Sequence, residues 1–214
     1  GEVVGLFGQV GAGRTEVLRA IFGADKIESG DIFLFGNKVQ IKSPLDAIRR
    51  GIGFITEDRK NQGLILSMDS LDNTNIGVYE KSMRLGFIQM KVLRKITEHF
   101  REALKIKISN LNIWTKFLSG GNQQKVILAK WLNHESKILL MDEPTKGIDV
   151  GAKQEFYQLI QDLSRRGVAI LLVTSELPEV LGLSDRIIVF KQGKIVGEVD
   201  PKDVTEEMIM SMTL

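Results

Sequence analysis

The feature that most constrains the fold is a glycine-rich stretch near the start of the chain, Gly8-Gln9-Val10-Gly11-Ala12-Gly13-Arg14-Thr15. It follows the apolar run at residues 3–7 and precedes a helical pattern at residues 16–22. Strand, glycine loop and helix in this order are typical of a phosphate-binding loop. The glycines let backbone N–H groups turn inward, and the helix N-terminus adds partial positive charge. The stretch predicts nucleotide binding, with the Thr15 hydroxyl placed to hold Mg²⁺.

Arg14 stands where the pattern G-x-x-x-x-G-K-[ST] has lysine. Arginine keeps the positive charge but replaces a compact ammonium with a planar fork. We therefore expect this group to lie at a different depth and angle beside the phosphates. An ordinary glycine-rich turn without a ligand is the alternative for this stretch alone. The residues predicted to contact nucleotide here are Gly8, Gln9, Val10, Gly11, Ala12, Gly13, Arg14, Thr15 and Glu16.

The composition is that of an ordinary globular protein. The 214 residues are 43% hydrophobic and 26% charged, with a formal net charge of +2, which suits one domain with a substantial core. No basic tail or basic-aromatic stripe is visible, so no nucleic-acid partner is expected. The absence of cysteine excludes a disulfide framework and a cysteine nucleophile. Because Gly1-Glu2 leads directly into the strand before the glycine loop, we expect an N-terminally truncated domain.

Apolar strand patterns alternate with helical patterns outside the middle of the chain. This predicts an α/β fold with a mainly parallel sheet, helices on both faces and some antiparallel strands. The core comprises residues 1–56 and 137–214, and residues 57–136 form an inserted helical subdomain. Within the helix expected at 91–108, one face is predicted to pack inward, and it carries Val92, Ile96, Phe100, Ala103 and Leu104. Strands are expected at 3–7, 31–35, 39–41, 52–56, 137–141, 168–173, 186–190 and 195–199, and helices at 16–22, 43–51, 91–108, 150–166, 176–183 and 204–212.

Two acidic residues, Asp142 and Glu143, follow the apolar run at residues 138–141. Beside a phosphate loop, Asp142 can hold Mg²⁺ through its water, and Glu143 can orient and deprotonate the attacking water. An apolar strand that simply ends in two acids is the alternative.

A second anion-binding helix start is predicted at Leu118-Ser119-Gly120-Gly121-Asn122-Gln123-Gln124-Lys125. Ser119 is a good N-cap, and the two glycines leave the first N–H groups open to a close anion. A chain with two such starts suggests a dimer in which the second start of each member completes the first start of the other. A structural Gly-Gly kink is the alternative.

In their order along the chain, these motifs resemble those of the ATPase domain of ABC transporters. Residues 118–123 are similar to the family's signature motif, residues 138–143 to its Walker B motif, and residues 146–149 to its D-loop, which ends at Asp149. Glu57 falls where the family has the Q-loop glutamine, and Ser175 where it has the switch histidine. Residues 57–60, 118–125, 147–153 and 175–180 further resemble the C-terminal half of tandem ATPase subunits of monosaccharide importers of the ribose, galactoside and xylose type.

The resemblance implies a domain that binds ATP and Mg²⁺ and drives sugar uptake at the cytoplasmic face of the membrane. Three departures, Arg14, Glu57 and Ser175, touch the γ-phosphate or the attacking water, so the domain's own site is expected to hydrolyse ATP poorly. The intact signature, with Ser119, Gly120, Gly121, Asn122, Gln123 and Asp149 as nucleotide-contacting residues, would complete the site of a partner.

Implied partners are the N-terminal ATPase half of the same polypeptide or a second ATPase domain, transmembrane permease subunits and, indirectly, a sugar-binding protein. A regulatory nucleotide-binding module without turnover is the alternative from another class. A soluble ABC ATPase of DNA repair or translation is disfavoured, because no long coiled-coil insertion or basic arm is visible.

Overall fold

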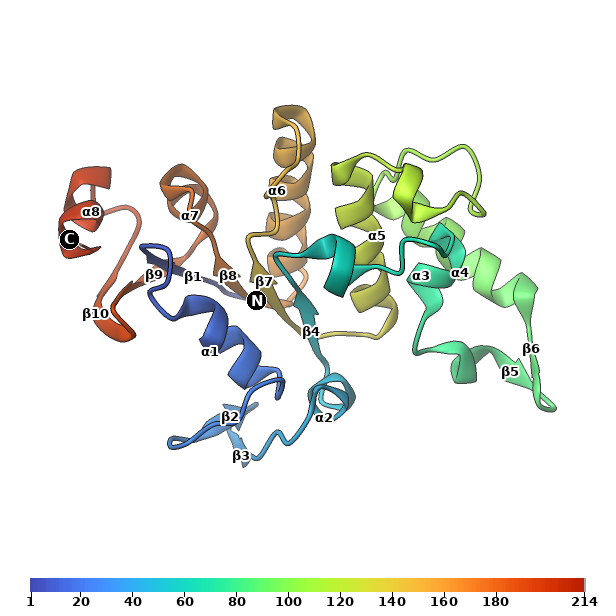
Figure 1. The fold of residues 1–214 in the computed structure, drawn as a ribbon, viewed down its shortest axis with the longest axis horizontal. Helices are drawn as coiled ribbons and strands as arrows, with labels where there is room; N and C mark the ends of the chain where they lie inside the picture. Colours follow the sequence, from blue (N-terminus) through green and yellow to red (C-terminus); the bar gives the residue numbers. More distant parts are fainter. Residues whose placement is uncertain (214) are drawn as a thin grey trace. The chain divides into compact units, whose positions relative to one another are not determined.

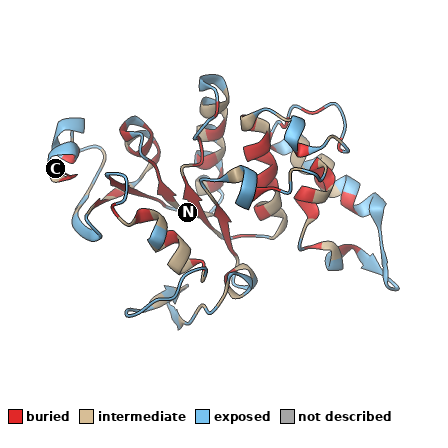
Figure 2. Cartoon of the chain, viewed as in Figure 1, coloured by how far each residue is buried: buried red, intermediate tan, exposed pale blue. Residues whose placement is uncertain are grey.

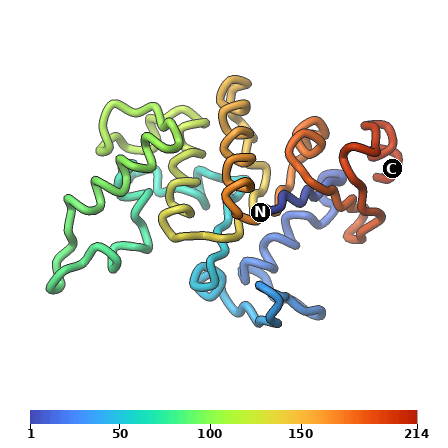
Figure 3. Tube along the Cα trace, turned by 180° about the vertical axis from the view of Figure 1, so that it is seen from behind, coloured from blue at the N-terminus to red at the C-terminus, as the bar shows by residue number. Residues whose placement is uncertain are grey.

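The computed structural model describes residues 1–213, which fold as two compact units. The first unit holds residues 1–54, 137–143 and those from 161 onward; the second holds residues 55–136 and 144–160. The chain leaves the sheet of the first unit after residue 55 and returns to it at residue 138. Figure 3 shows the course of the chain from the N-terminus to the C-terminus. The middle of the chain is therefore inserted into an α/β core.

A six-stranded sheet organises the first unit (Figure 1). Its central strands β9, β1, β8 and β7 run parallel, and β10 is antiparallel to β9. The predicted, mainly parallel sheet with added antiparallel strands is confirmed. In sheet order the strands are β10 (Lys194–Val199), β9 (Arg186–Lys191), β1 (Val3–Gly8), β8 (Ala169–Val173), β7 (Ile138–Asp142) and β4 (Ile52–Ile55).

Helices cover β1 from both sides, which explains why all six of its residues are buried. Helix α1 (Arg14–Ile21) packs on β1 and β7, and α7 (Leu177–Leu183) packs on β1 from the opposite side (Figure 1). Helix α8 (Glu206–Thr213) covers β9 and β10. One apolar cluster joins β1, α7, β9 and α8, and it includes Phe7, Leu177, Val180, Ile187, Val189 and Ile209.

A small hairpin and a short helix complete the first unit. In the hairpin of β2 (Ile32–Leu34) and β3 (Asn37–Val39), the turn falls on Phe35 and Gly36, both with positive φ, rather than on the predicted 36–38. Helix α2 (Pro44–Arg49) begins as predicted, because the Ser43 hydroxyl accepts the N–H of Asp46 at 3.3 Å.

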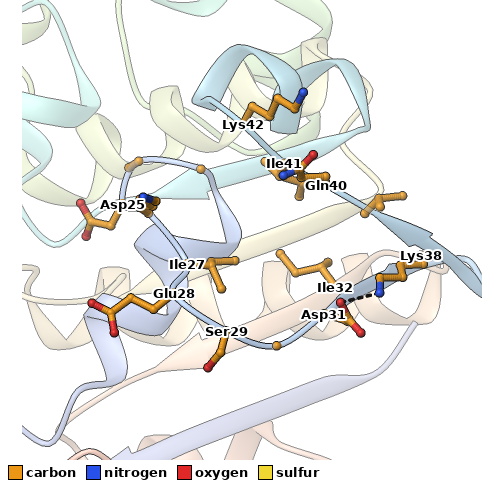
Figure 4. A pocket seen from close by; sticks show the side chains of 15 residues that line it. Asp25, Ile27, Glu28, Ser29, Asp31, Ile32, Lys38, Gln40, Ile41 and Lys42 are labelled. Atoms are coloured by element: carbon orange, nitrogen blue, oxygen red, sulfur yellow. Dashed lines mark ion pairs between the residues drawn. The ribbon is translucent and has the colours of Figure 1, made fainter.

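A hollow of about 790 Å³ lies beside this hairpin (Figure 4). Ile27, Ile32 and Ile41 line it, and an ion pair of 2.8 Å joins Lys38 to Asp31 at its edge. None of the residues predicted to bind nucleotide lines this hollow.

The second unit is helical. Helix α3 (Ser70–Asn75) packs against α4 (Met90–Ala103) and α5 (Gly120–Asn133), and these two also contact each other. Short helical turns lie at Arg59–Gly63, Tyr79–Ser82 and Thr115–Phe117. Helix α6 (Val150–Arg165) begins in this unit and ends in the first.

The predicted inward face of α4 is right only in part. Leu104 is buried and Phe100 is half-buried, but the buried face begins at Leu93 and Thr97, whereas Val92 is 43% exposed. A hairpin of β5 (Met83–Arg84) and β6 (Phe87–Ile88) lies within the segment predicted to be mainly helical. Figure 2 shows this hairpin as exposed. Among residues 1–213, we find no helix with the length and apolar character that crossing a membrane requires.

Candidate functional site

Three strand ends bring the predicted catalytic residues of the first unit to one edge of its sheet. Leu6 of β1 lies in register with Val173 of β8, and Val173 in turn with Asp142 of β7. The strands are parallel, so their carboxyl ends meet, and ligands of α/β sheets bind at such an edge. The glycine loop, Asp142 with Glu143, and Ser175 all follow directly from these ends.

The glycine loop has the open backbone that anion binding needs. Gly11 and Gly13 have φ values of 80° and 95°, a region that favours glycine. Gly13 caps α1 without any side-chain hydrogen bond. A Cβ on Gly8 would lie 2.4 Å from the carbonyl oxygen of Phe190, so only glycine fits there. This backbone can present N–H groups to a phosphate at the start of α1.

The Arg14 side chain is buried, and its fork is directed to backbone carbonyls. Nη1 donates to the carbonyl oxygen of Thr174 at 2.8 Å, and Nη2 donates to that of Gln9 at 3.4 Å. A lysine ammonium carries all its donors on one nitrogen, whereas the two contacts here come from different nitrogens of the planar guanidinium. The charge is therefore held beneath the loop and against the end of β8.

Two buried side chains that the sequence did not indicate support this contact. The Thr174 hydroxyl donates to Oε2 of Glu179 at 2.8 Å and accepts the N–H of Glu176 at 3.0 Å. Thr174 and Glu179 are both buried. This pair fixes the peptide whose carbonyl accepts the Arg14 guanidinium. One indication of this pair is present in the sequence, the acidic Glu179 among the apolar residues of α7.

Glu143 and Ser175 lie together at the same edge. The Ser175 hydroxyl donates to Oε2 of Glu143 at 3.2 Å, and the N–H of Glu143 donates to the carbonyl of Val173 at 2.9 Å. Glu143 has a φ of 46°, the left-handed region that a non-glycine residue occupies only when its surroundings hold it there. The carboxylate is thus aimed by backbone strain and by the serine.

The donors at this edge fit Mg²⁺. The Thr15 hydroxyl at the start of α1 and the buried carboxylate of Asp142 are both oxygen donors, and α1 packs on β7. Mg²⁺ in phosphate sites takes one or two protein oxygens and completes its shell with phosphates and water. Among the described residues, no group of three or more His, Cys, Asp or Glu side chains could hold a metal ion.

The second predicted helix start lies in the second unit, at the beginning of α5. The Ser119 hydroxyl accepts the backbone N–H of Asn122 at 3.5 Å and its side-chain amide at 3.0 Å. A Cβ on Gly120 would lie 2.7 Å from the carbonyl oxygen of Gly147, and a Cβ on Gly121 would lie 2.6 Å from Cβ of Ala152. The glycines are thus required by close packing against the segment at 147–152.

A cavity of about 300 Å³ opens beside this helix start, lined by Lys107, Ser119, Gly121, Asn122, Lys125, Asp149, Gly151, Ala152 and Glu155. Asp149 caps α6, because its Oδ1 accepts the N–H of Ala152 at 2.9 Å. Glu155 pairs with Lys107 at 2.8 Å and with Lys125 at 2.6 Å. These two lysines lower the pKa of the Glu155 carboxyl to about 2.

Two predicted residues of the second unit have other neighbours. Gln123 is buried; its amide donates to the carbonyl of Thr115 at 2.9 Å, and its Oε1 accepts from Arg59 at 3.1 Å. Glu57 is exposed and pairs with Lys146 at 2.5 Å. Arg59 was not predicted as a site residue, and nothing in the sequence around it indicates its contacts.

Comparison with known proteins identifies the family. A sequence profile described as "ABC transporter" matches residues 1–146. The chain belongs to the ABC transporter family. A solved nucleotide-free ATP-binding cassette from an ABC transporter superposes with a TM-score of 0.80 at 24% identity, covering 99% of this chain and 83% of that one. The predicted cassette fold is confirmed.

The curated relatives of this ABC family member include import proteins. It is 47% identical over 212 residues to the "Ribose import ATP-binding protein RbsA" of Bacillus licheniformis, which covers 99% of this chain and 43% of the relative. It is 47% identical over 215 residues to the "Arabinose import ATP-binding protein AraG" of Vibrio parahaemolyticus, which covers 100% of this chain and 42% of the relative. The chain thus spans less than half the length of these relatives.

Proposed function

We propose that residues 1–214 form a nucleotide-binding domain of an ABC importer that couples ATP binding and hydrolysis to sugar uptake. The core of this domain is residues 1–56 and 137–214, and the helical part is residues 57–136. In this proposal the domain's own site holds Mg-ATP but turns it over slowly. Its signature stretch, residues 118–123, completes the faster site of a second ATPase domain.

The position of Arg14 carries the first half of the proposal. The guanidinium donates to the carbonyls of Thr174 and Gln9, so its charge is partly committed to the protein. Charge stabilisation of a transferring phosphoryl group depends on donors preorganised at the developing charge. Ser175, a short hydroxyl paired with Glu143, cannot take up a proton as an imidazole does. Both features favour binding over turnover.

The cavity at the start of α5 supports the second half. It combines a capped helix N-terminus with Ser119, Asn122 and Asp149 at its wall. A helix N-terminus with free N–H groups attracts phosphate. Asp149 lines the cavity, so in this proposal the segment at 146–149 would contact the same nucleotide.

Partners and location follow from the relatives. Both are named as import ATP-binding proteins, for ribose and for arabinose. We infer that the chain acts at the cytoplasmic face of the membrane as a peripheral subunit. Its partners would be transmembrane permease subunits, a second ATPase domain in the same polypeptide and, indirectly, a sugar-binding protein.

The test is ATP hydrolysis by the full-length protein assembled with its permease, comparing the wild type with the double variant Arg14→Lys, Ser175→His. Restoring both groups should raise the rate at this domain's own site. Because the partner's faster site sets the background rate, total turnover should rise by up to about twofold, the value reached when both sites work equally fast. Arg19→Lys, on the same helix but exposed and paired with Asp25, is the matched control.

An unchanged rate in the double variant would contradict the proposal of an impaired own site. If neither protein hydrolyses ATP but both bind it, the chain is instead a regulatory module.

A further inference from the structure

Arg59 makes three contacts that no sequence motif indicates. It lies in the short helical turn at Arg59–Gly63, which is capped by Asp58. Its Nε donates to Oε1 of Gln123 at 3.1 Å, its Nη1 to the carbonyl of Lys146 at 2.6 Å and its Nη2 to the carbonyl of Gly147 at 3.1 Å. One side chain thus joins three segments that are far apart in the sequence.

The three acceptors differ in their surroundings, because Gln123 is buried whereas the bonds to the carbonyls of Lys146 and Gly147 are exposed. Gln123 is buried in the first turns of α5, and its amide end already donates to Thr115, so Arg59 satisfies its remaining oxygen. The two carbonyls belong to consecutive peptides, at Lys146 and Gly147, immediately before the cap of α6. Hydrogen bonds from a charged donor are about twice as strong as neutral ones. The planar fork of arginine can meet three acceptors at once.

The segments that Arg59 joins are also closely packed against one another. A Cβ on Gly120 would lie 2.7 Å from Nη2 of Arg59 and 2.7 Å from the carbonyl oxygen of Gly147. Farther along α5, a Cβ on Gly63 would lie 2.6 Å from Cδ1 of Ile127. Nζ of Lys130 donates to the carbonyl of Gly63 at 2.7 Å. The turn is therefore seated on α5 at both of its ends.

We propose that Arg59 is a positioning residue that clasps the start of α5 and residues 146–149 to the turn at 57–63, so that these segments move as one body. Its contribution to turnover rests on the proposed function, because the cavity that these segments frame would hold the partner site's phosphate. A displacement of the turn at 57–63 would then be transmitted directly to Ser119 and Asp149.

The first experiment measures hydrogen exchange in the full-length protein. Arg59→Met keeps the aliphatic stem and removes the three donors. Exchange at the amides of Ile148 and Ala152, which are bonded to Thr145 and Asp149, should rise about tenfold or more. Exchange in residues 3–15 should stay within about twofold. Lys60→Met, exposed on the same turn, is the matched control and should match the wild type.

A second variant and a second readout separate the clasp from general loss of structure. Arg59→Lys supplies one ammonium in place of a three-armed fork, so it should reproduce most of the effect. In the assembled transporter, kcat should fall about tenfold in both Arg59 variants while the KM for ATP changes less than about twofold.

The outcomes distinguish the two proposals. Unchanged exchange at residues 145–153 in Arg59→Met, or full restoration by Arg59→Lys, would overturn the clasp. Raised exchange in a full-length protein that never hydrolyses ATP would uphold the clasp and refute the proposed function.

Discussion

Burial of the Lys130 ammonium predicts how the stability of the second unit changes with pH. Its ammonium, partly buried on α5, donates to the carbonyl of Gly63 and lies 4.8 Å from the ring centroid of Trp131. Burial lowers the pKa of this amine from its ordinary value of 10.5 to about 8. The folded protein thus holds the Lys130 proton less tightly than the unfolded chain does.

The sign of the pH dependence follows from this difference. Below about pH 8 both states are protonated, and burial of the charge costs a constant amount. Between pH 8 and 10.5 the unfolded chain binds more protons, so the free energy of unfolding rises with pH. One pKa unit corresponds to 1.36 kcal/mol, so the wild type should gain about 2 kcal/mol between pH 7 and pH 9.5 from this group.

The contribution of Lys130 to the free energy of unfolding can be isolated by urea unfolding of the wild type and of Lys130→Met at several pH values, with circular dichroism as the readout. The variant loses a hydrogen bond at every pH but lacks the titration, so the wild type should gain about 2 kcal/mol relative to it. Lys91→Met, at an exposed position in α4, should follow the wild type at each pH. Parallel curves for the wild type and Lys130→Met would refute the reasoning.

Two further predictions concern the second unit. Asn73 is buried, and its side chain bonds both the N–H and the carbonyl of Ile65. Asn73→Ala should therefore lower the free energy of unfolding, measured in urea, by about 3 kcal/mol. A loss no larger than that of the control Asn61→Ala, in an exposed turn, would contradict this prediction. The pKa of Glu155 is about 2, below its ordinary 4.5, so its pairing stabilises the fold above pH 4.5 and the benefit disappears as pH falls towards 2. The wild type should therefore exceed Glu155→Gln in free energy of unfolding at pH 6, and this difference should shrink by about 1 kcal/mol at pH 3, a value reduced because the pair is exposed to solvent. A difference that stays constant with pH would contradict this prediction.

The core of the fold was predictable because its signals are local. Glycines between an apolar strand and a helix indicate the loop at 8–15. Ser43 followed by Pro44 marks the start of α2. The mainly parallel character of the sheet also follows from buried strands alternating with helices. These features depend on backbone chemistry within a few positions, which the sequence displays directly.

Other features depend on partners that the sequence does not reveal. Arg59 bonds mainly to backbone carbonyls, and any residue type at positions 146 and 147 supplies one. The β5–β6 hairpin turns on Leu85 and Gly86, a weaker turn signal than Asn-Gly, and its strands are two residues long. In α4 the buried face depends on which neighbours it meets. At Arg14 the departure was visible, whereas its two carbonyl acceptors were not.

The placement of β1 in the middle of the sheet has a consequence for how the chain acquires its structure during synthesis. Val3 pairs with Ile170, and Val4 with Arg186, so β1 waits for partners that lie far along the chain and emerge much later. Until then its apolar residues have no sheet to join, and such distant pairings form slowly. The helical second unit, built from nearby contacts, can fold on the ribosome well before the strands on either side of β1 close around it.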